Sequence, residues 1–158
     1  MPATFLLERR QHVPRRIDEV FEFFSDARNL GAITPDHLRF QILTPLPITM
    51  GEGTLVEYRL SLFGLPFRWK TRIESWEPGR RFVDVQLEGP YRLWRHVHEF
   101  LEVEGGTLVR DEVTYQLPLG PLGLVAHALF VRRQVAAIFD HRQRRIAELL
   151  APRSAAVR

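Results

Sequence analysis

Cysteine is absent from this 158-residue sequence, which excludes disulfide bonds, thiolate metal sites and cysteine nucleophiles. The first residues carry no basic segment followed by an apolar one, so we expect no signal peptide. No unbroken apolar run approaches the length needed to cross a bilayer, so we also expect no transmembrane segment. Together these absences favour a soluble protein in a reducing, cytoplasmic environment.

Lysine is almost absent as well, because Lys70 is the only one among 22 basic residues and the other 21 are arginine. The formal net charge is only +3, and the pI of about 9.9 partly reflects the arginines, which do not titrate near neutral pH. Without a focused basic stripe, this charge does not indicate nucleic-acid binding. Phosphate loops, nucleophile elbows and dinucleotide fingerprints are missing too, so we expect neither a nucleic-acid partner nor a cofactor.

Apolar residues, in contrast, are plentiful. Hydrophobic residues make up 45% of the chain, with 11 Phe and 3 Trp, which is enough for the core of one domain. We expect a single domain over residues 1–151 and a flexible C-terminal tail over residues 152–158.

The apolar pattern predicts one strand, two short helices and then six more strands. Residues 17–24 place Ile17, Val20, Phe21 and Phe24 at the i, i+3, i+4, i+7 spacing of one helix face, and a second short helix covers residues 27–33. Alternation and tight turns predict strands over residues 4–13, 37–43, 54–63, 66–76, 81–88, 91–103 and 107–117.

Residues 122–150 have the apolar spacing of one long helix. Apolar side chains occupy so much of its circumference that protein must cover most of it. We therefore predict an α+β fold in which this helix lies across the concave face of a curved, six- to seven-stranded antiparallel sheet. A sheet closed in this way often leaves a cavity that binds small molecules.

Three segments resemble one known group of proteins. They are residues 14–26, residues 89–100, and residues 111–118 followed by Gly120-Pro121-Leu122-Gly123. Their order and spacing resemble the START/SRPBCC superfamily, in particular its bacterial ligand-binding, polyketide cyclase/dehydrase-like branch. The resemblance implies the helix-grip fold and an internal cavity. It implies no single activity, because the superfamily includes carriers, sensors and a few enzymes.

Turn lengths predict which side chains face the cavity. A two-residue turn at Gly105-Gly106 places His96 opposite Tyr115, and a two-residue turn at Pro78-Gly79 places Ile73 opposite Asp84. This register leaves the apolar residues Val83, Val85 and Leu87 on the outer face. The predicted ligand-binding residues are Tyr58, Phe67, Trp69, Thr71, Gln86, Trp94, His96, His98, Phe100, Tyr115 and Phe139.

His96 and His98 share one face of their strand. This spacing is compatible with zinc, with Asp111 or Asp84 as a third ligand. We favour two other interpretations. The histidines are polar groups of the cavity that bind a ligand or water, or they form a structural, hydrogen-bonded pair. We therefore predict no metal.

The same residues are the candidates for catalysis. Asp84 beside His96 would orient an imidazole as a general base for a cyclase or dehydratase, with His98 and Asp111 as the other candidates. The simpler alternative, which we favour, is that a buried carboxylate pairs with a histidine or with Arg92 or Arg95 to satisfy its hydrogen bonds.

The long helix is basic in its second half, where Arg132, Arg133, Arg142, Arg144 and Arg145 gather. A solvated helix face is favoured over a surface for anionic membranes or nucleic acid.

These observations predict a protein that binds a hydrophobic small molecule, such as a lipid, a polyketide-like aromatic or a quinone, between sheet and helix. The alternatives are a cyclase/dehydratase that uses a His/Asp pair and a peripheral module that binds a membrane or a partner protein. The sequence leaves a homo-oligomer open.

Overall fold

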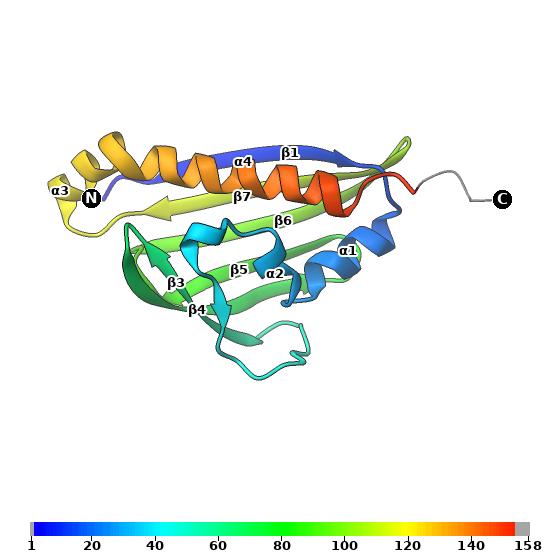
Figure 1. The fold of residues 1–158 in the computed structure, drawn as a ribbon, viewed down its shortest axis with the longest axis horizontal. Coiled ribbons are helices and arrows are strands. Elements are labelled where there is room, and N and C mark those ends of the chain that lie inside the picture. The colour runs from blue at the N-terminus through cyan, green and yellow to red at the C-terminus, as the bar shows by residue number, and fades with distance from the viewer. Residues whose placement is uncertain (1, 154–158) are drawn as a thin grey trace.

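The computed structural model describes residues 2–153, which form one seven-stranded antiparallel sheet and a long C-terminal helix (Figure 1). The strand order is β1-β7-β6-β5-β4-β3-β2. The strands are β1 (Phe5–Val13), β2 (Gln41–Ile42), β3 (Leu55–Leu62), β4 (Leu65–Glu77), β5 (Arg81–Glu88), β6 (Leu93–Val103) and β7 (Gly106–Gln116). The helical elements are α1 (Ile17–Ser25), α2 (Asn29–Ala32), η1 (Asp36–Leu38), α3 (Gly120–Ala126), η2 (His127–Val131) and α4 (Arg132–Leu149). The predicted α+β helix-grip fold is confirmed.

The segment after α1 is less regular than predicted. The second helix shortens to α2, and the strand expected over residues 37–43 is reduced to the two residues of β2. The cause is the 3-10 turn η1, which ends at Arg39 with a positive φ of 50° and so prevents an extended strand there. Most of the predicted tail, residues 154–158, lies outside the described residues.

The C-terminal helix is continuous from Gly120 to Leu149, but its middle is π-helical in η2. A single α-helix was expected here. The extra residue of a π turn rotates α3 relative to α4. Only α4 therefore presents a consistently buried stripe to the sheet, made of Val135, Phe139, Arg142 and Ile146.

Two core clusters lie between the helices and the inner face of the sheet. The first joins Val135 and Phe139 of α4 to aromatic residues of β4 and β7, such as Trp69 and Tyr115. The second packs Phe21 of α1 and Ile146 of α4 against Phe82, Phe100 and neighbouring residues. The long helix thus covers the sheet as predicted.

The β6–β7 register differs from the prediction by two residues, whereas the β4–β5 register agrees with it. In β6–β7 the last pair is Val103 with Gly106, so His96 lies opposite Val113 and not Tyr115. A shift of two residues leaves every side chain on its predicted face. Between β4 and β5, Ile73 does pair with Asp84, but a three-residue turn and a bulge near residue 74 produce this register.

Val83 is an apolar residue that the predicted register places on the outer face of β5. It points away from the cavity, as the register requires, and is nevertheless fully buried opposite Val97. Phe82 and Asp84, its neighbours in sequence, line the cavity. Both faces of the sheet are therefore apolar at this position.

The helix from Gly120 to Leu149 is long and apolar enough to cross a membrane by length and composition, which corrects the expectation that no segment would be. Its inner face, however, belongs to both core clusters through Val135, Phe139 and Ile146. It therefore acts as the core helix of this fold.

Candidate functional site

A cavity of about 180 Å³ lies between the inner face of the sheet, α4 and the segment from α1 to η1. Its walls are mostly aromatic and aliphatic. They are formed by Phe23, Phe24, Leu30, Ile33, Leu38, Phe40, Val56, Tyr58, Leu60, Trp69, Ile73, Phe82, Tyr91, Trp94, Val135, Ile138 and Phe139, among others. Polar side chains also reach it, notably Thr71, Asp84, His96, His98 and Arg142.

Most of the residues that the sequence assigned to ligand binding meet in this cavity. They are Tyr58, Trp69, Thr71, Trp94, His96, His98 and Phe139. They come from β3, β4, β6 and α4, and the hairpin parity places the strand residues on one face.

Four residues assigned to the same set do not line the cavity. The Gln86 amide turns to the backbone of Tyr91, donating to its carbonyl (2.7 Å) and accepting from its N–H (3.2 Å). Phe100 is enclosed in the second core cluster, and Phe67 packs at the edge of the first. The Tyr115 hydroxyl hydrogen-bonds His127 Nε2 at 2.8 Å. A shared face thus places a side chain inside the fold but does not ensure contact with the cavity.

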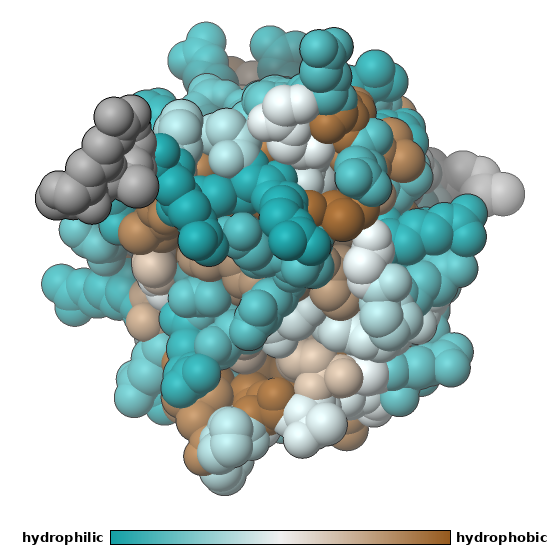
Figure 2. All heavy atoms as spheres, turned by 90° about the vertical axis from the view of Figure 1, so that its right-hand side faces the viewer, coloured by the Kyte–Doolittle hydropathy of each residue, from teal (hydrophilic) through white to brown (hydrophobic). Residues whose placement is uncertain are grey.

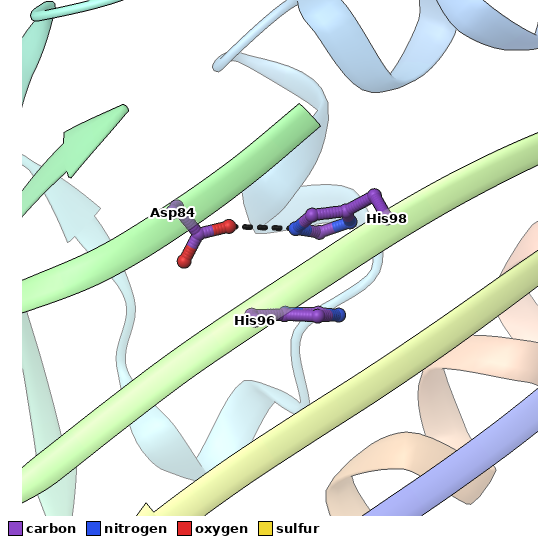
Figure 3. A group of neighbouring side chains, drawn as sticks. All are labelled: Asp84, His96 and His98. Atoms are coloured by element: carbon purple, nitrogen blue, oxygen red, sulfur yellow. Dashed lines mark hydrogen bonds and ion pairs between the residues drawn. The ribbon is translucent and has the colours of Figure 1, made fainter. Parts of the chain in front are cut away.

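Two histidine–aspartate pairs form the polar centre of the site, and Figure 3 shows one of them, His98 with Asp84, beside His96. His98 Nε2 donates to Asp84 Oδ2 at 2.6 Å, and His96 Nε2 donates to Asp111 Oδ1 at 2.7 Å. In the strand register, Asp84 lies opposite His96 and Asp111 opposite His98. Each hydrogen bond therefore runs diagonally to the histidine two residues along β6.

The two imidazoles stack on each other. Their ring centroids are 3.6 Å apart with an interplanar angle of 26°, and Phe82 stacks on the other face of His98 at 4.1 Å. Phe139 meets His96 edge-on at 5.4 Å. The histidines are therefore held rigidly by aromatic neighbours as well as by the carboxylates.

Arg142 completes the charge cluster from the helix side. Arg142 is only 8% exposed, and its Nη2 lies 3.5 Å from Asp111 Oδ1. The guanidinium also sits over the rings of Phe24 (5.2 Å) and Phe139 (5.8 Å). Its Nε and Nη2 have no hydrogen-bond partner, and neither has Nδ1 of His98. Buried polar atoms without a hydrogen bond are rare. The two Arg142 nitrogens are donors, whereas Nδ1 of His98 is an acceptor, because Nε2 carries the proton that is donated to Asp84.

Burial and pairing set the protonation states of the cluster. Burial alone would raise the pKa of Asp84, but the hydrogen bond and charge of His98 outweigh it and lower that pKa. The pKa of Asp111 is lowered well below its usual range because Arg142 and the hydrogen bond from His96 overcome burial in the same way. Burial, helped by the charge of His96, lowers the pKa of His98 to about 4, against the pull of Asp84. At neutral pH, both carboxylates are ionised and His98 is neutral.

Asp84, His96 and His98 each offer a metal-ligand atom within 4.8 Å of the others. The donor types would suit zinc. However, the stacked imidazoles direct their lone pairs in nearly parallel planes, and their Nε2 atoms are engaged by carboxylates. The buried charge of Arg142 already faces Asp111. The geometry is that of a hydrogen-bonded network.

The main residue that sequence reasoning missed is Arg142, which was assigned to a solvated helix face. A signal was present, because Arg142 falls in the stripe formed by Val135, Phe139 and Ile146 at helical spacing. The contribution of the segment from α1 to η1, including Phe24 and Asn29, was also missed. The alternation of side chains along strands predicts only which strand residues face inward, so it gives no information on that segment.

Comparisons with known proteins identify the family and the fold. The family described as polyketide cyclase/dehydrase and lipid transport matches residues 13–142. A Chromobacterium violaceum protein of known structure aligns with a TM-score of 0.69 at 16% identity, covering 96% of this chain and 99% of that one. Major latex-like protein 151 of Panax ginseng aligns with a TM-score of 0.68 at 14% identity, covering 94% and 99%.

A protein of Rhodobacter sphaeroides aligns with a TM-score of 0.68 at 19% identity, covering 92% of this chain and 91% of that one. At these identities the solved structures share the fold alone. No curated protein matches the sequence. The family match covers most of the chain and includes every residue of the histidine–aspartate cluster. The chain therefore belongs to the polyketide cyclase/dehydrase and lipid transport family, within the START/SRPBCC superfamily.

Proposed function

We propose that this protein binds a small hydrophobic molecule in the cavity between the sheet and α4. The observation that carries the proposal is the cavity itself, which has aromatic and aliphatic walls and one cluster of polar groups. This composition is typical of small-molecule sites. The ligand-binding residues we propose are Tyr58, Trp69, Thr71, Trp94, His96, His98, Phe139 and Arg142.

The cavity size favours a ligand with a compact body. An engineered protein cavity of about 150 Å³ holds one benzene molecule. The 180 Å³ found here therefore suits one aromatic or quinone ring better than an extended acyl chain. Among the ligand classes that the sequence suggests, a ring-shaped molecule has the stronger support.

The polar cluster favours a ligand that carries an oxygen acceptor. Arg142 lines the cavity, and its buried Nε and Nη2 make no hydrogen bond, although Nη2 lies 3.5 Å from Asp111 Oδ1. A carbonyl or hydroxyl oxygen of the ligand would satisfy them, and hydrogen bonds to charged groups are worth about 1.5–3 kcal/mol. Water can fill the same role in the free protein.

Matched probes test this proposal. Acetophenone has one ring and a carbonyl oxygen, and ethylbenzene has a similar size without the oxygen. Trp69 and Trp94 line the cavity, so their fluorescence should report binding. We expect saturable binding of both probes, with acetophenone the tighter one, and loss of both in Val135→Phe, which fills the cavity. Absence of saturable binding by any single-ring probe would reject the proposal.

A second candidate function, supported by the histidine–aspartate pairs, is proton abstraction next to a carbonyl group, as a cyclase or dehydratase requires. His96, oriented by Asp111, would accept the carbon-bound proton, and Arg142 would stabilise the resulting enolate oxygen. His98 is the poorer base, because its pKa is lowered to about 4.

Deuterium exchange distinguishes binding from catalysis. In D₂O, a general base would exchange the methyl protons of bound acetophenone, which NMR detects directly. We expect binding without exchange. Exchange that is at least about 100-fold slower in His96→Gln, with acetophenone affinity retained, would instead establish general-base catalysis.

We further propose that residues 1–151 act as one ligand-binding domain in the cytoplasm. The absence of cysteine supports this location. Both core clusters draw on the N-terminal strand and the C-terminal helix, which supports one unit. Limited proteolysis that released a stable shorter fragment would contradict the single domain.

A further inference from the structure

The first part of the C-terminal helix exposes large apolar side chains to solvent. Leu122 is 70% exposed, Leu129 56% and Phe130 57%. Together with neighbouring residues they form a surface that we call the apolar end. It consists of Phe63, Leu65, Leu119, Leu122, Leu124, Val125, Leu129 and Phe130, all of which are exposed.

The apolar end combines two separate parts of the chain. Phe63 lies in the β3–β4 turn, and its ring meets Phe130 of η2 edge-on at 6.3 Å. In Figure 1 the β3–β4 turn and α3 lie at the same end of the molecule. Figure 2 shows the opposite end, where hydrophilic side chains dominate. Single exposed apolar residues are ordinary, but a group of this size marks an interaction site.

The sequence segments that form the apolar end contain no acidic residue. No acidic residue occurs between Glu112 and Asp140, or between Glu57 and Glu74. The cations next to it in sequence, Arg132 and Arg133 at the start of α4, are exposed, and Arg68 on β4 is exposed but pairs with Glu57 at 3.7 Å. The surface is thus an apolar centre with an arginine rim and no carboxylate within its own segments.

We propose that the apolar end inserts into the surface of an anionic lipid bilayer. Apolar side chains would lie at the boundary between headgroups and acyl chains, and the arginines would lie near the lipid phosphates. A second copy of the chain fits less well, because a two-fold contact through the same surface brings like arginine rims together. This proposal is independent of what the cavity binds.

Vesicle sedimentation tests the proposal with the full-length chain. We expect binding to phosphatidylcholine vesicles that contain phosphatidylglycerol, and much weaker binding to phosphatidylcholine alone. Leu122→Glu and Phe130→Glu should each weaken binding by more than about tenfold, because a buried apolar side chain is lost. Arg132→Gln and Arg133→Gln should each weaken it by about fivefold, and added salt should do the same.

Leu101→Glu is the matched control. Leu101 is an exposed leucine on β6, near the β6–β7 turn and away from α3. Its substitution should leave vesicle binding unchanged. No binding to anionic vesicles, or equal loss in Leu101→Glu and Leu122→Glu, would overturn the proposal. So would sedimentation velocity showing a dimer that Leu122→Glu dissociates, because the surface would then serve self-association.

A gain-of-signal variant covers the case in which a glutamate variant fails to fold. Phe130→Trp places a tryptophan at the apolar end, whereas the native Trp69, Trp76 and Trp94 are at least half buried. We expect its emission to shift to shorter wavelength on addition of anionic vesicles and to be quenched by brominated lipid. Unchanged emission relative to the wild type would overturn the proposal.

Discussion

Burying Asp84, Asp111 and Arg142 in an otherwise apolar cavity is costly unless each charge is compensated. Asp111 accepts from His96 and faces Arg142, and Asp84 accepts from His98. Among the described residues, four buried side-chain atoms make no hydrogen bond, and all four belong to residues that line the cavity: Arg142 Nε and Nη2, His98 Nδ1 and Trp69 Nε1. At the scale of single residues, the unmet hydrogen-bonding capacity is therefore concentrated where a ligand would bind.

Removing the charge of Arg142 should strongly destabilise the protein. In Arg142→Met the carboxylate of Asp111 loses its cationic neighbour, and we expect the free energy of unfolding to fall by about 3–5 kcal/mol. Adding Asp111→Asn should recover most of that loss, because the uncompensated charge is gone. Urea denaturation of the two single variants and the double variant measures this coupling.

Arg144→Met is the control for this pair, since Arg144 is exposed on the same helix. Its effect should stay within about 0.5 kcal/mol. Equal effects of Arg142→Met and Arg144→Met would show that the buried pair contributes nothing.

Stability should fall as the pH drops, in two stages. The fold lowers the pKa of His98 from 6.5 to about 4, so the unfolded chain takes up a proton first and stability is lost between about pH 6.5 and pH 4. The pKa values of Asp84 and Asp111 are also lowered in the fold. Their contribution is present above about pH 4 and is lost as the pH falls further, through their folded-state pKa values.

The variant His98→Gln isolates the first stage. Glutamine retains a donor for Asp84 but does not titrate, so the loss of stability between pH 6.5 and pH 4 should become smaller by up to about 3 kcal/mol. Urea denaturation at a series of pH values compares the variant with the wild type. Identical pH profiles would mean that His98 is protonated equally in the folded and unfolded chains.

The candidate site was only partly predictable at this scale. His96, His98, Asp84 and Asp111 follow from strand alternation, because an even register error preserves the face of a side chain. The pairing within the cluster does not follow, since each histidine bonds the diagonal carboxylate and not the one opposite. Side-chain torsions decide that choice, and the strand pattern carries no information on them.

At the scale of elements, the strands and the long helix were predictable because their apolar periods are strong and their turns are short. The region after α1 was not, because η1 depends on a positive φ at Arg39, which few residues other than glycine favour. The π-helical segment η2 could not be predicted from the sequence either. The apolar stripe of the helix is already wide, and one extra residue per turn hardly changes its pattern.

His127 should anchor η2 to the sheet. Its ring stacks on Phe5 with centroids 3.4 Å apart, and its Nε2 is 2.8 Å from the Tyr115 hydroxyl. We expect His127→Leu to lower the free energy of unfolding by about 1–3 kcal/mol, because the buried hydroxyl loses its partner. Hydrogen exchange should accelerate mainly in α3 and η2.

Tyr115→Phe separates the two contributions of His127. It removes the hydrogen bond but keeps both rings, so its effect should be smaller than that of His127→Leu. Uniform acceleration of exchange along α4 in His127→Leu would show that η2 is not a separate anchoring unit.

At the scale of the whole molecule, the closure of the sheet by α4 determines what fits inside. The helix presents Val135, Ile138 and Phe139 to the cavity, and the opposite wall carries Leu60 and Trp69. Aromatic residues make up much of this lining, and their rings have few rotamers. Such a cavity selects ligands by shape, and a change in one wall residue should change the size of ligand that binds.

Leu60→Ala tests this size selection. Leu60 is 7% exposed and lines the cavity from β3, so its truncation enlarges the cavity and should lower the free energy of unfolding by about 2–5 kcal/mol. Affinity for acetophenone should fall because contacts are lost, while affinity for the two-ring acetonaphthone should rise. The tryptophan fluorescence titration used for the wild type measures both. Leu87→Ala is the matched control, since Leu87 lies exposed on the outer face of β5, and it should change neither affinity. A parallel loss of affinity for both ketones in Leu60→Ala would mean that the cavity volume does not set the size of the ligand.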